Sequence, residues 1–247
     1  MRDLEKSQSM SAFTRLEFLA ALFSVGVLCM LALPMLANTR PRSDRVTCLN
    51  NLRRIGHAEH LWAIEHNDQM PWWVDLSEGG TRGANLQNNV WFNYGIMTNE
   101  LVTPMILACP SDPGTRMARD FSALAGGFFH SGNKNNSVSY FIGLHSFLTS
   151  ADWSLGYGRG VVQKAMAGDR NLRPTALNQS CESGPTVAAA VLPGSSQAAW
   201  TNAIHGVVGN VLMIDGQVLQ SSNARFLDVI APSALGAGYP VHLLMPH

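Results

Sequence analysis

The chain has 247 residues, which is enough for one or two domains. It carries 17 Lys and Arg against 17 Asp and Glu, so its formal net charge is +0, and only 14% of its residues are charged. Such a balanced, sparsely charged chain offers no basic surface for the phosphates of DNA or RNA, and we expect no nucleic-acid partner.

The longest apolar stretch lies near the N-terminus. The segment from Phe18 to Ala37 contains 20 residues without a charge. Its only interruptions are Ser24, Gly26 and Pro34. Twenty residues make a helix of roughly 30 Å, which matches the hydrocarbon core of a bilayer, and a helix satisfies its own backbone hydrogen bonds in lipid. The sequence therefore predicts a single-pass membrane anchor surrounded by membrane lipid.

A short polar leader precedes this run. Residues 12–17 read Ala-Phe-Thr-Arg-Leu-Glu, and the apolar run follows at once. A secretory signal would instead have a shorter apolar core with a small-residue cleavage site behind it, and residues 36–38 make only a poor one. The order of a small residue, Phe-Thr-x-x-Glu and an apolar helix resembles the N-terminus of type IV prepilins and pseudopilins.

In that family a membrane peptidase cuts before the Phe, methylates the new amino terminus and leaves the helix in place. The resemblance implies cleavage between Ala12 and Phe13, N-methylation of Phe13, and Glu17 as the fifth mature residue. Pro34 becomes the twenty-second, where pilin helices often carry a kinking proline. The implied partners are the prepilin peptidase and other pilin-like subunits, bound through the N-terminal helix.

Glu17 also has a physical argument of its own. A carboxylate costs about 2.5–3.5 kcal/mol at the centre of a membrane helix and less near its end, so an unpaired one is poorly tolerated in depth. Cleavage turns the amine of Phe13 into a positive charge one helical turn away. In a filament a neighbour's amine would pair with Glu17 and set the register between subunits. The alternative is that Glu17 lies at the lipid headgroups, paired with Arg15 or with water.

The residues after the anchor predict a second helix. Pro41 either interrupts regular helix or begins a new one, and residues 43–67 carry apolar side chains at helical spacing, with Ser43 or Asp44 as the cap. Such a stripe suits a helix laid against a sheet. The stripe consists of Cys48, Leu52, Ile55, Gly56, Trp62 and Ala63, and the flank beside it carries Arg53, His57 and His60.

Several short elements resemble one group in particular. They are Cys-Leu-Asn-Asn-Leu-Arg-Arg-Ile at 48–55, Cys-Pro-Ser-Asp at 109–112, Gly-Asp-Arg-Asn at 168–171, and His-Gly at 205–206 with the Asp-Gly at 215–216. These are similar to elements of the prepilin-type proteins of planctomycetes and verrucomicrobia that contain the domain of unknown function 1559. The resemblance implies an α+β, pilin-like fold, in which a long N-terminal helix, transmembrane and then amphipathic, packs on a C-terminal antiparallel β-sheet head.

The head itself gives few local signals. Residues 75–89 and 126–136 predict loops, residues 90–94 favour a strand or a buried aromatic turn, and residues 138–142 fit a short strand. The clearest signal is at 210–220, where Asp215 and Gly216 separate two strand-like runs and suit a type I′ hairpin turn, since both central residues need positive φ. We also expect Asp169 and Arg170 to pair with each other.

The four cysteines predict one disulfide. Cys29 lies in the apolar run, where it acts as a small hydrophobe. Cys48, Cys109 and Cys181 would face an oxidising periplasm, in which two of the three pair and one thiol remains.

Nothing in the sequence predicts an enzyme, a metal site or a cofactor. The metal candidates are His57 with His60, and His130, His145 and His205 with Asp215 or Asp169. The i, i+3 spacing on the helix lacks the H-E-x-x-H pattern and a third ligand, so we expect a solvated or packed helix face. His205 is expected to anchor the hairpin by a hydrogen bond. The chain lacks a G-x-S-x-G elbow, a phosphate-binding glycine loop and an EF-hand loop.

The chain is interpreted as a leader (1–12), a transmembrane and assembly helix (13–37), an amphipathic helix that continues the spine (38–71) and a periplasmic globular head (72–247). Lys and Arg are balanced around the span, so the orientation follows from the resemblance. We expect an inner-membrane pseudopilin with a cytoplasmic N-terminus, polymerised in a type IV pilus or a type II secretion-like filament.

Two alternatives remain. The first is a membrane-tethered periplasmic binding module for a glycan or surface ligand, supported only by Trp72, Trp73 and Trp91 if these are exposed. The second is a hydrolase with a histidine site.

Overall fold

The computed structural model describes residues 14–37, 39–144, 165–181, 184–192, 194–230 and 240–246, without the side chains of residues 31–42. The chain divides into two compact units, Met1–Ser43 and Asp44–His247, and each is described by itself. The predicted leader, the Ala12–Phe13 junction and His145 lie outside the described residues, as does the side chain of Pro34.

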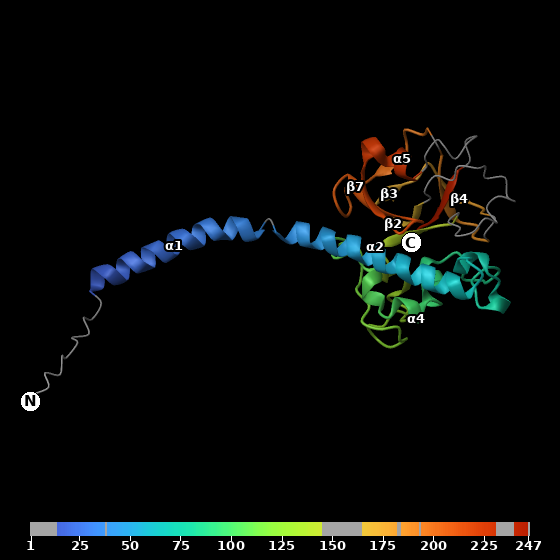
Figure 1. The fold of residues 1–247 in the computed structure, drawn as a ribbon, viewed down its shortest axis with the longest axis horizontal. Coiled ribbons are helices and arrows are strands. Elements are labelled where there is room, and N and C mark those ends of the chain that lie inside the picture. The colour runs from blue at the N-terminus through green and yellow to red at the C-terminus, as the bar shows by residue number, and fades with distance from the viewer. Residues whose placement is uncertain are drawn as a thin grey trace, which may run out of the picture. The chain divides into compact units, whose positions relative to one another are not determined.

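The first unit contains helix α1 (Arg15–Ala37), which has 23 residues (Figure 1). Its described side chains, those of residues 15–30, are all exposed. Apolar side chains surround the helix axis instead of occupying one face. Among the described residues, no helix combines the length and the apolar character needed to cross a membrane.

Helix α2 (Thr39–Glu65) is the second helix that the sequence predicts, and it begins four residues earlier than expected. Pro41 lies in its first turn, where the missing N–H removes no intrahelical hydrogen bond. Ser43 and Asp44 therefore lie inside the helix, and the prediction that one of them caps it is wrong. The apolar stripe is confirmed, because all six of its members, Cys48, Leu52, Ile55, Gly56, Trp62 and Ala63, are buried.

Among the described residues, seven strands of the second unit form one antiparallel sheet in the order β4-β5-β9-β1-β2-β7-β8 (Figure 1). The α+β class with an antiparallel sheet is confirmed, and the strand expected at 138–142 starts two residues later. The strands are β1 (Tyr140–Gly143), β2 (Ala165–Asp169), β4 (Ala176–Gln179), β5 (Ala188–Val191), β7 (Val208–Met213), β8 (Val218–Ser222) and β9 (Val241–Leu244), with β3 (Leu172–Arg173) and β6 (Ala199–Trp200) forming a separate pair.

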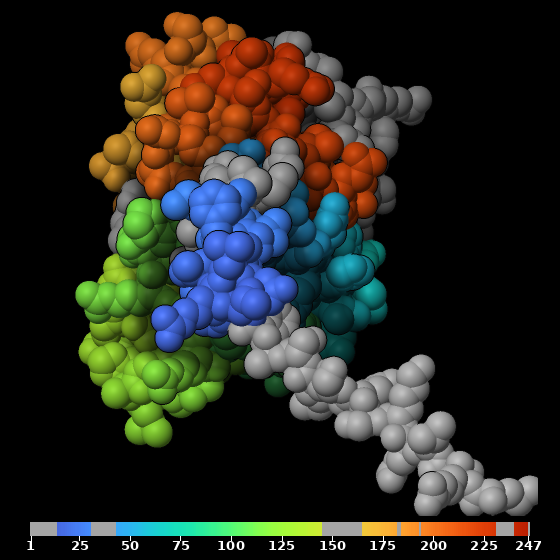
Figure 2. Space-filling view, turned by 90° about the vertical axis from the view of Figure 1, so that its left-hand side faces the viewer, coloured from blue at the N-terminus to red at the C-terminus, as the bar shows by residue number. Residues whose placement is uncertain are grey.

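Helix α2 packs between two parts of the second unit (Figure 1). One is the sheet, and the other is the segment of short helices and turns that lies between α2 and β1 in the chain. Figure 2 shows the strand-rich segments, orange to red, and the green segments at opposite sides of the view. On the sheet side, a Cβ at Gly56 would lie 3.0 Å from the Leu212 side chain of β7, so the glycine permits a close approach. On the other side, Asn51 Nδ2 donates to the Ala108 carbonyl at 3.0 Å.

The segment between α2 and the sheet consists of short helices and turns. Residues 75–89 are turns around one 3₁₀ helix, as expected for a loop. Residues 90–94 belong to helix α3 (Val90–Gly95), so the strand alternative is wrong. The amide of Asn93 donates to the carbonyls of Gln87 and Asn89, which satisfies backbone groups within a turn. Helix α4 (Thr98–Leu101) follows, and helix α5 (Phe226–Ile230) comes after β8.

The predicted β7–β8 hairpin is present, but its turn is not the two-residue type I′ turn. Met213 N donates to Gln217 O at 2.8 Å and Gly216 N donates to Met213 O at 2.9 Å, so residues 214–216 form a three-residue loop. In this loop only Gly216 has positive φ, at 80°. This is the arrangement of a type I turn followed by a glycine bulge. Asp215 Oδ1 accepts a hydrogen bond from Gln217 N at 3.0 Å.

Candidate functional site

Four segments that are far apart in the sequence meet beside α2, and we call this group the motif cluster. It unites every one of the short elements on which the resemblance to the prepilin-type group depends, apart from the hairpin turn. Each element is recognisable in the sequence, but the sequence does not predict that they touch. The cluster consists of Cys48 and Asn51 of α2, Cys109 and Asp112 after the 3₁₀ helix Pro104–Leu107, Asp169, Arg170 and Asn171 at the end of β2, His205 shortly before β7, and Asn210 within β7.

A disulfide joins the first two segments. Cys48 and Cys109 are bonded, with their Cα atoms 5.1 Å apart and a sequence separation of 61. Cys48 belongs to the buried stripe of α2, so the bond fixes this helix to the turn that carries Cys109. Cys181, the third candidate for the disulfide, is buried and takes no part in this bond, and Cys29 is exposed on α1.

A buried ion pair joins the second segment to the third. Arg170 Nε lies 2.7 Å from Asp112 Oδ2, and a terminal nitrogen of Arg170 donates to Asp112 Oδ1 at 3.0 Å. The Asp112 side chain is 4% exposed and the Arg170 side chain 21%. Burial would raise the pKa of Asp112, but hydrogen bonds from Arg170, Thr115 and Ser139 outweigh it and hold the pKa below its ordinary value.

The expected pair of Asp169 and Arg170 does not form, and that prediction is wrong. Successive side chains at the end of a strand point to opposite faces, so these neighbours reach different partners. Asp169 Oδ2 instead accepts from the backbone N of Asn210 at 2.7 Å and from its side-chain amide at 2.9 Å. Burial raises the pKa of Asp169 to about 7, in spite of these two hydrogen bonds.

His205 lies between the disulfide and Asp169. Its Nε2 is 3.4 Å from Cys109 Sγ and 3.6 Å from Asp169 Oδ2, and its carbonyl accepts from Arg45 at 3.0 Å. Burial, followed by the positive charge of Arg45, lowers the pKa of His205 to about 4, so the imidazole is neutral at pH 7. The prediction that His205 anchors the hairpin by a hydrogen bond is wrong, because its ring lies beside Cys109 and Asp169 instead.

The burial of the motif cluster decides what it can do in this form. Cys48, Cys109, Asp169 and Asn210 are at most 2% exposed, and His205 is 7% exposed. Because these groups lie out of reach of solvent and of a substrate, they hold α2, the Cys109 turn and the sheet together. We find no arrangement among them that would activate a nucleophile toward an external molecule.

Glu59 is a second buried polar group of α2. It is 0% exposed, and neither carboxylate oxygen has a hydrogen-bond partner among the described residues. Burial raises the pKa of Glu59 well above its ordinary value. Burial also raises the pKa of Tyr94 well above its ordinary value, and a nearby negative charge on Glu59 would raise it further. Since an unpaired buried carboxylate is costly, burial favours the protonated form of Glu59 in the folded protein.

We expect Glu59→Gln to flatten the dependence of stability on pH. Above about pH 4.5 the unfolded chain loses the Glu59 proton while the folded protein keeps it, so the native free energy of unfolding falls as the pH rises toward the elevated pKa. The glutamine variant lacks this decline and should be the more stable form at the alkaline end. Urea unfolding of both proteins at several pH values measures the difference.

The matched control for this comparison is Glu65→Gln, because Glu65 is exposed at the end of the same helix. This variant should follow the native pH dependence. An equal decline in Glu59→Gln and in the native chain would contradict a buried, protonated Glu59.

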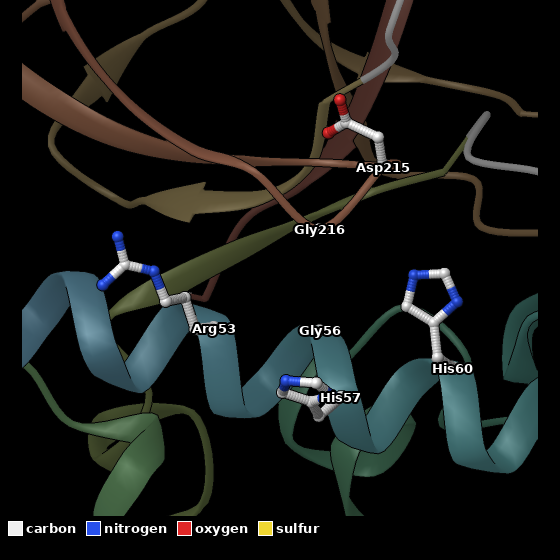
Figure 3. Close-up of a pocket in the computed structure, with 6 residues that line it drawn as sticks. All are labelled: Arg53, Gly56, His57, His60, Asp215 and Gly216. Carbon is white, nitrogen blue, oxygen red and sulfur yellow. The ribbon is translucent and has the colours of Figure 1, made fainter.

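A pocket of about 450 Å³ lies between α2 and the β7–β8 turn (Figure 3). Arg53 and His60 extend from α2 to the side on which Asp215 lies (Figure 3). The pocket thus brings together the polar flank of α2 and the β7–β8 turn, which are far apart in the sequence. In the described part of the chain, however, ligand atoms gather closely enough for a metal ion only at Cys48, Cys109 and His205. The pocket residues are Arg53, Gly56, His57, His60, Asp215 and Gly216.

The three tryptophans proposed as an exposed binding surface are largely internal. Trp72 is 1% exposed, and Trp73 and Trp91 are half-buried. The indole nitrogens of Trp72 and Trp73 both donate to the carbonyl of Leu144, at 3.1 and 2.9 Å. These side chains therefore belong to the core and its border.

Glu17 forms a capping box at the start of α1. Thr14 N donates to Glu17 Oε2 at 2.8 Å, and Glu17 N donates to Thr14 Oγ1 at 3.3 Å. The hydroxyl of Thr14 also donates to Glu17 Oε2, at 3.0 Å. Thr-x-x-Glu before an apolar run is the sequence signature of this cap, so the contact could have been predicted.

No protein-family model matches the chain, and comparison with curated proteins and with solved structures gives no match.

Proposed function

We propose that this protein is a pilin-like subunit, anchored in the inner membrane by its N-terminal helix and assembled through that helix into a type IV pilus or a type II secretion-like filament. Cleavage after Ala12 and N-methylation of Phe13 precede assembly, and the head lies in the periplasm. One observation carries the proposal, namely the order of Ala12, Phe13 and Glu17 directly before a run of 20 uncharged residues.

The character of α1 supports this role. Leu16, Phe23 and Met30 are 79%, 75% and 77% exposed, and apolar side chains surround the helix. A helix that is apolar on every side is stable when lipid or other helices cover it. The proposed anchor, Phe18 to Ala37, would be covered by lipid before assembly and by neighbouring subunits afterwards.

The capping box is compatible with pairing between subunits. Both of the hydrogen bonds that Thr14 donates to Glu17 end on Oε2. The second oxygen, Oε1, accepts no hydrogen bond within the described part of the chain. A neighbour's terminal amine can therefore bind Oε1 while the cap on Oε2 keeps the carboxylate oriented.

The second unit supports the proposal through its architecture. An amphipathic helix, α2, buries one face against an antiparallel sheet, as a spine helix does in a pilin-like head. The disulfide and the Arg45 contact with His205 fix this helix to the head near its first turns.

The mature N-terminus tests the proposal directly. We expect the intact mass of the chain extracted from membranes to begin at Phe13 with one added methyl group. Because the family almost always has Gly before the cut, Ala12→Gly should be processed at least as fully as the native chain. A chain that retains Met1, or one that begins after Ala37, would contradict the proposal.

A second experiment separates a filament subunit from a tethered module. Glu17→Ala should be processed and inserted but should fail to assemble, because it removes the carboxylate that a neighbour's Phe13 amine would bind. Sedimentation and electron microscopy of sheared surface material measure assembly. Arg15→Ala, which changes a charge in the same turn without touching the carboxylate, is the control and should assemble. Normal filaments from Glu17→Ala would exclude the pairing.

A further inference from the structure

We propose that Cys48, Cys109, His205 and Asp169 form a binding site for zinc or another thiophilic divalent cation once the disulfide is reduced. The buried cluster would then exist in two chemical states, a disulfide and a metal thiolate. The inference concerns the head alone, so it stands or falls independently of the pilin-like role.

The spacing of the ligand atoms carries the proposal. Cys48 Sγ, Cys109 Sγ and His205 Nε2 all lie within 4.8 Å of one another. His205 Nε2 is 3.4 Å from Cys109 Sγ and 3.6 Å from Asp169 Oδ2. In a tetrahedral zinc site with ordinary bond lengths, a nitrogen lies about 3.5 Å from a sulfur ligand and about 3.3 Å from a carboxylate oxygen. Both of these edges are already close to the required length.

The edge between the two sulfurs must lengthen, and the Asp169 carboxylate must move closer to them, because among the residues that the structure describes only Cys48, Cys109 and His205 have ligand atoms that all lie within 4.8 Å of one another. The disulfide holds the sulfurs 2.11 Å apart, whereas two thiolates on one zinc ion lie about 3.8 Å apart. Breaking the bond allows this separation, and the sulfurs then gain the negative charge that makes them good ligands. In the disulfide form neither sulfur carries a charge, so this form should not bind the cation.

The surroundings suit a cation as well. Asp169 is fully buried, and its Oδ1 has no hydrogen-bond partner among the described residues, so the carboxylate lacks full compensation. Asn210 donates twice to the other oxygen and orients it, as groups around a metal ligand commonly do. Two thiolates and one carboxylate give three negative charges against the two positive charges of zinc. Arg45, bound to the His205 carbonyl, supplies a further positive charge nearby.

The chemistry balances in two steps. A phosphine reductant and one water molecule convert the Cys48–Cys109 disulfide into two thiols and yield the phosphine oxide. A divalent cation then replaces the two thiol protons, which are released to solvent, and binds the neutral imidazole of His205 and the carboxylate of Asp169.

Cobalt provides the test, because a tetrahedral cobalt–thiolate site absorbs strongly in the visible and near ultraviolet. The full chain is used in detergent with Cys29→Ser and Cys181→Ser, which removes the other two cysteines. After reduction, the chain should bind one equivalent of Co²⁺, and Zn²⁺ should displace it. The oxidised chain should bind none.

Variants of the ligands then locate the site. Cys109→Ser and His205→Ala should abolish the cobalt spectrum, and Asn210→Ala should weaken binding by about 10- to 100-fold. His57→Ala, an exposed histidine of α2, is the matched control and should bind normally.

Thermal unfolding shows whether the reduced chain and its variants are folded. Zinc should raise the midpoint of the reduced chain and leave the oxidised chain unchanged. Several results would each overturn the proposal. They are a reduced chain without the cobalt–thiolate spectrum, equal binding by the oxidised chain, retention of the spectrum by Cys109→Ser, and a reduced chain that is unfolded and that zinc fails to refold.

Discussion

Replacing Cys48 and Cys109 together with alanine should lower the free energy of unfolding by about 4 kcal/mol. The disulfide closes a loop with a sequence separation of 61, and removing a link of that length restores about 14 cal/mol/K of entropy to the unfolded chain. Urea unfolding of the oxidised native chain and of the double variant, both full-length, measures the loss. Reduction of the native chain without added metal should give a loss of similar size.

The control for this prediction is Cys29→Ala, because Cys29 is exposed on α1 and outside the disulfide. It should unfold at the native urea concentration. A loss of less than about 1 kcal/mol in the double variant would show that the disulfide constrains the unfolded chain little. Restoration of the lost stability by zinc in the reduced native chain, and not in the double variant, would tie this measurement to the proposed metal site.

Arg170→Met should lower the free energy of unfolding by about 3 kcal/mol. Removing one partner of a buried ion pair leaves the other charge uncompensated, which typically costs about 3–5 kcal/mol. The lower end of this range applies because the Arg170 side chain is 21% exposed, so water can partly take the place of the removed guanidinium beside Asp112. Asp112, which is 4% exposed, keeps its charge but loses two hydrogen bonds. Urea unfolding at neutral pH measures the effect.

The pH dependence of this variant follows from the pKa of Asp112. Its folded pKa lies below the ordinary 3.8, so the stability that the pair contributes is complete above that value and is lost as the pH falls through the folded pKa. The difference between the native chain and Arg170→Met should therefore shrink in acid. Arg173→Met, which alters an exposed arginine three residues away, is the control and should change stability little. A constant difference at all pH values would contradict the pairing.

Features governed by local spacing could be predicted from the sequence. The stripe from Cys48 to Ala63 repeats with the helical period, so it indicated both α2 and the face that is buried. Alternating apolar residues around Asp215 and Gly216 likewise predicted the two strands of the hairpin. The turn type could not be predicted, because Asp-Gly suits both a two-residue and a three-residue loop. Only the pairing of Met213 with Gln217 shows that the loop has three residues.

Contacts between distant segments could not be predicted in this way. Asp169 and Arg170 are adjacent opposite charges, so the sequence alone predicts that they pair. At the end of β2, however, their side chains point in opposite directions. The partners that they do bind, Asn210 and Asp112, lie 41 and 58 residues away. The sequence showed that each element of the motif cluster was present, but their meeting around α2 depends on the order of the strands in the sheet.

The position of the disulfide on α2 has a mechanical consequence. A force that pulls α2 along its axis from its N-terminal end is passed on to the Cys109 turn and to His205 through Cys48 and Arg45. At Cys48 the helix is covalently bonded to the chain at Cys109, so it cannot slide along the sheet unless that bond breaks or the Cys109 turn moves with it. The apolar contacts of Leu52 and Trp62, further along the helix, would then bear only the part of the force that the disulfide does not carry. Under tension, the part of α2 that belongs to the second unit and the Cys109 turn would move together.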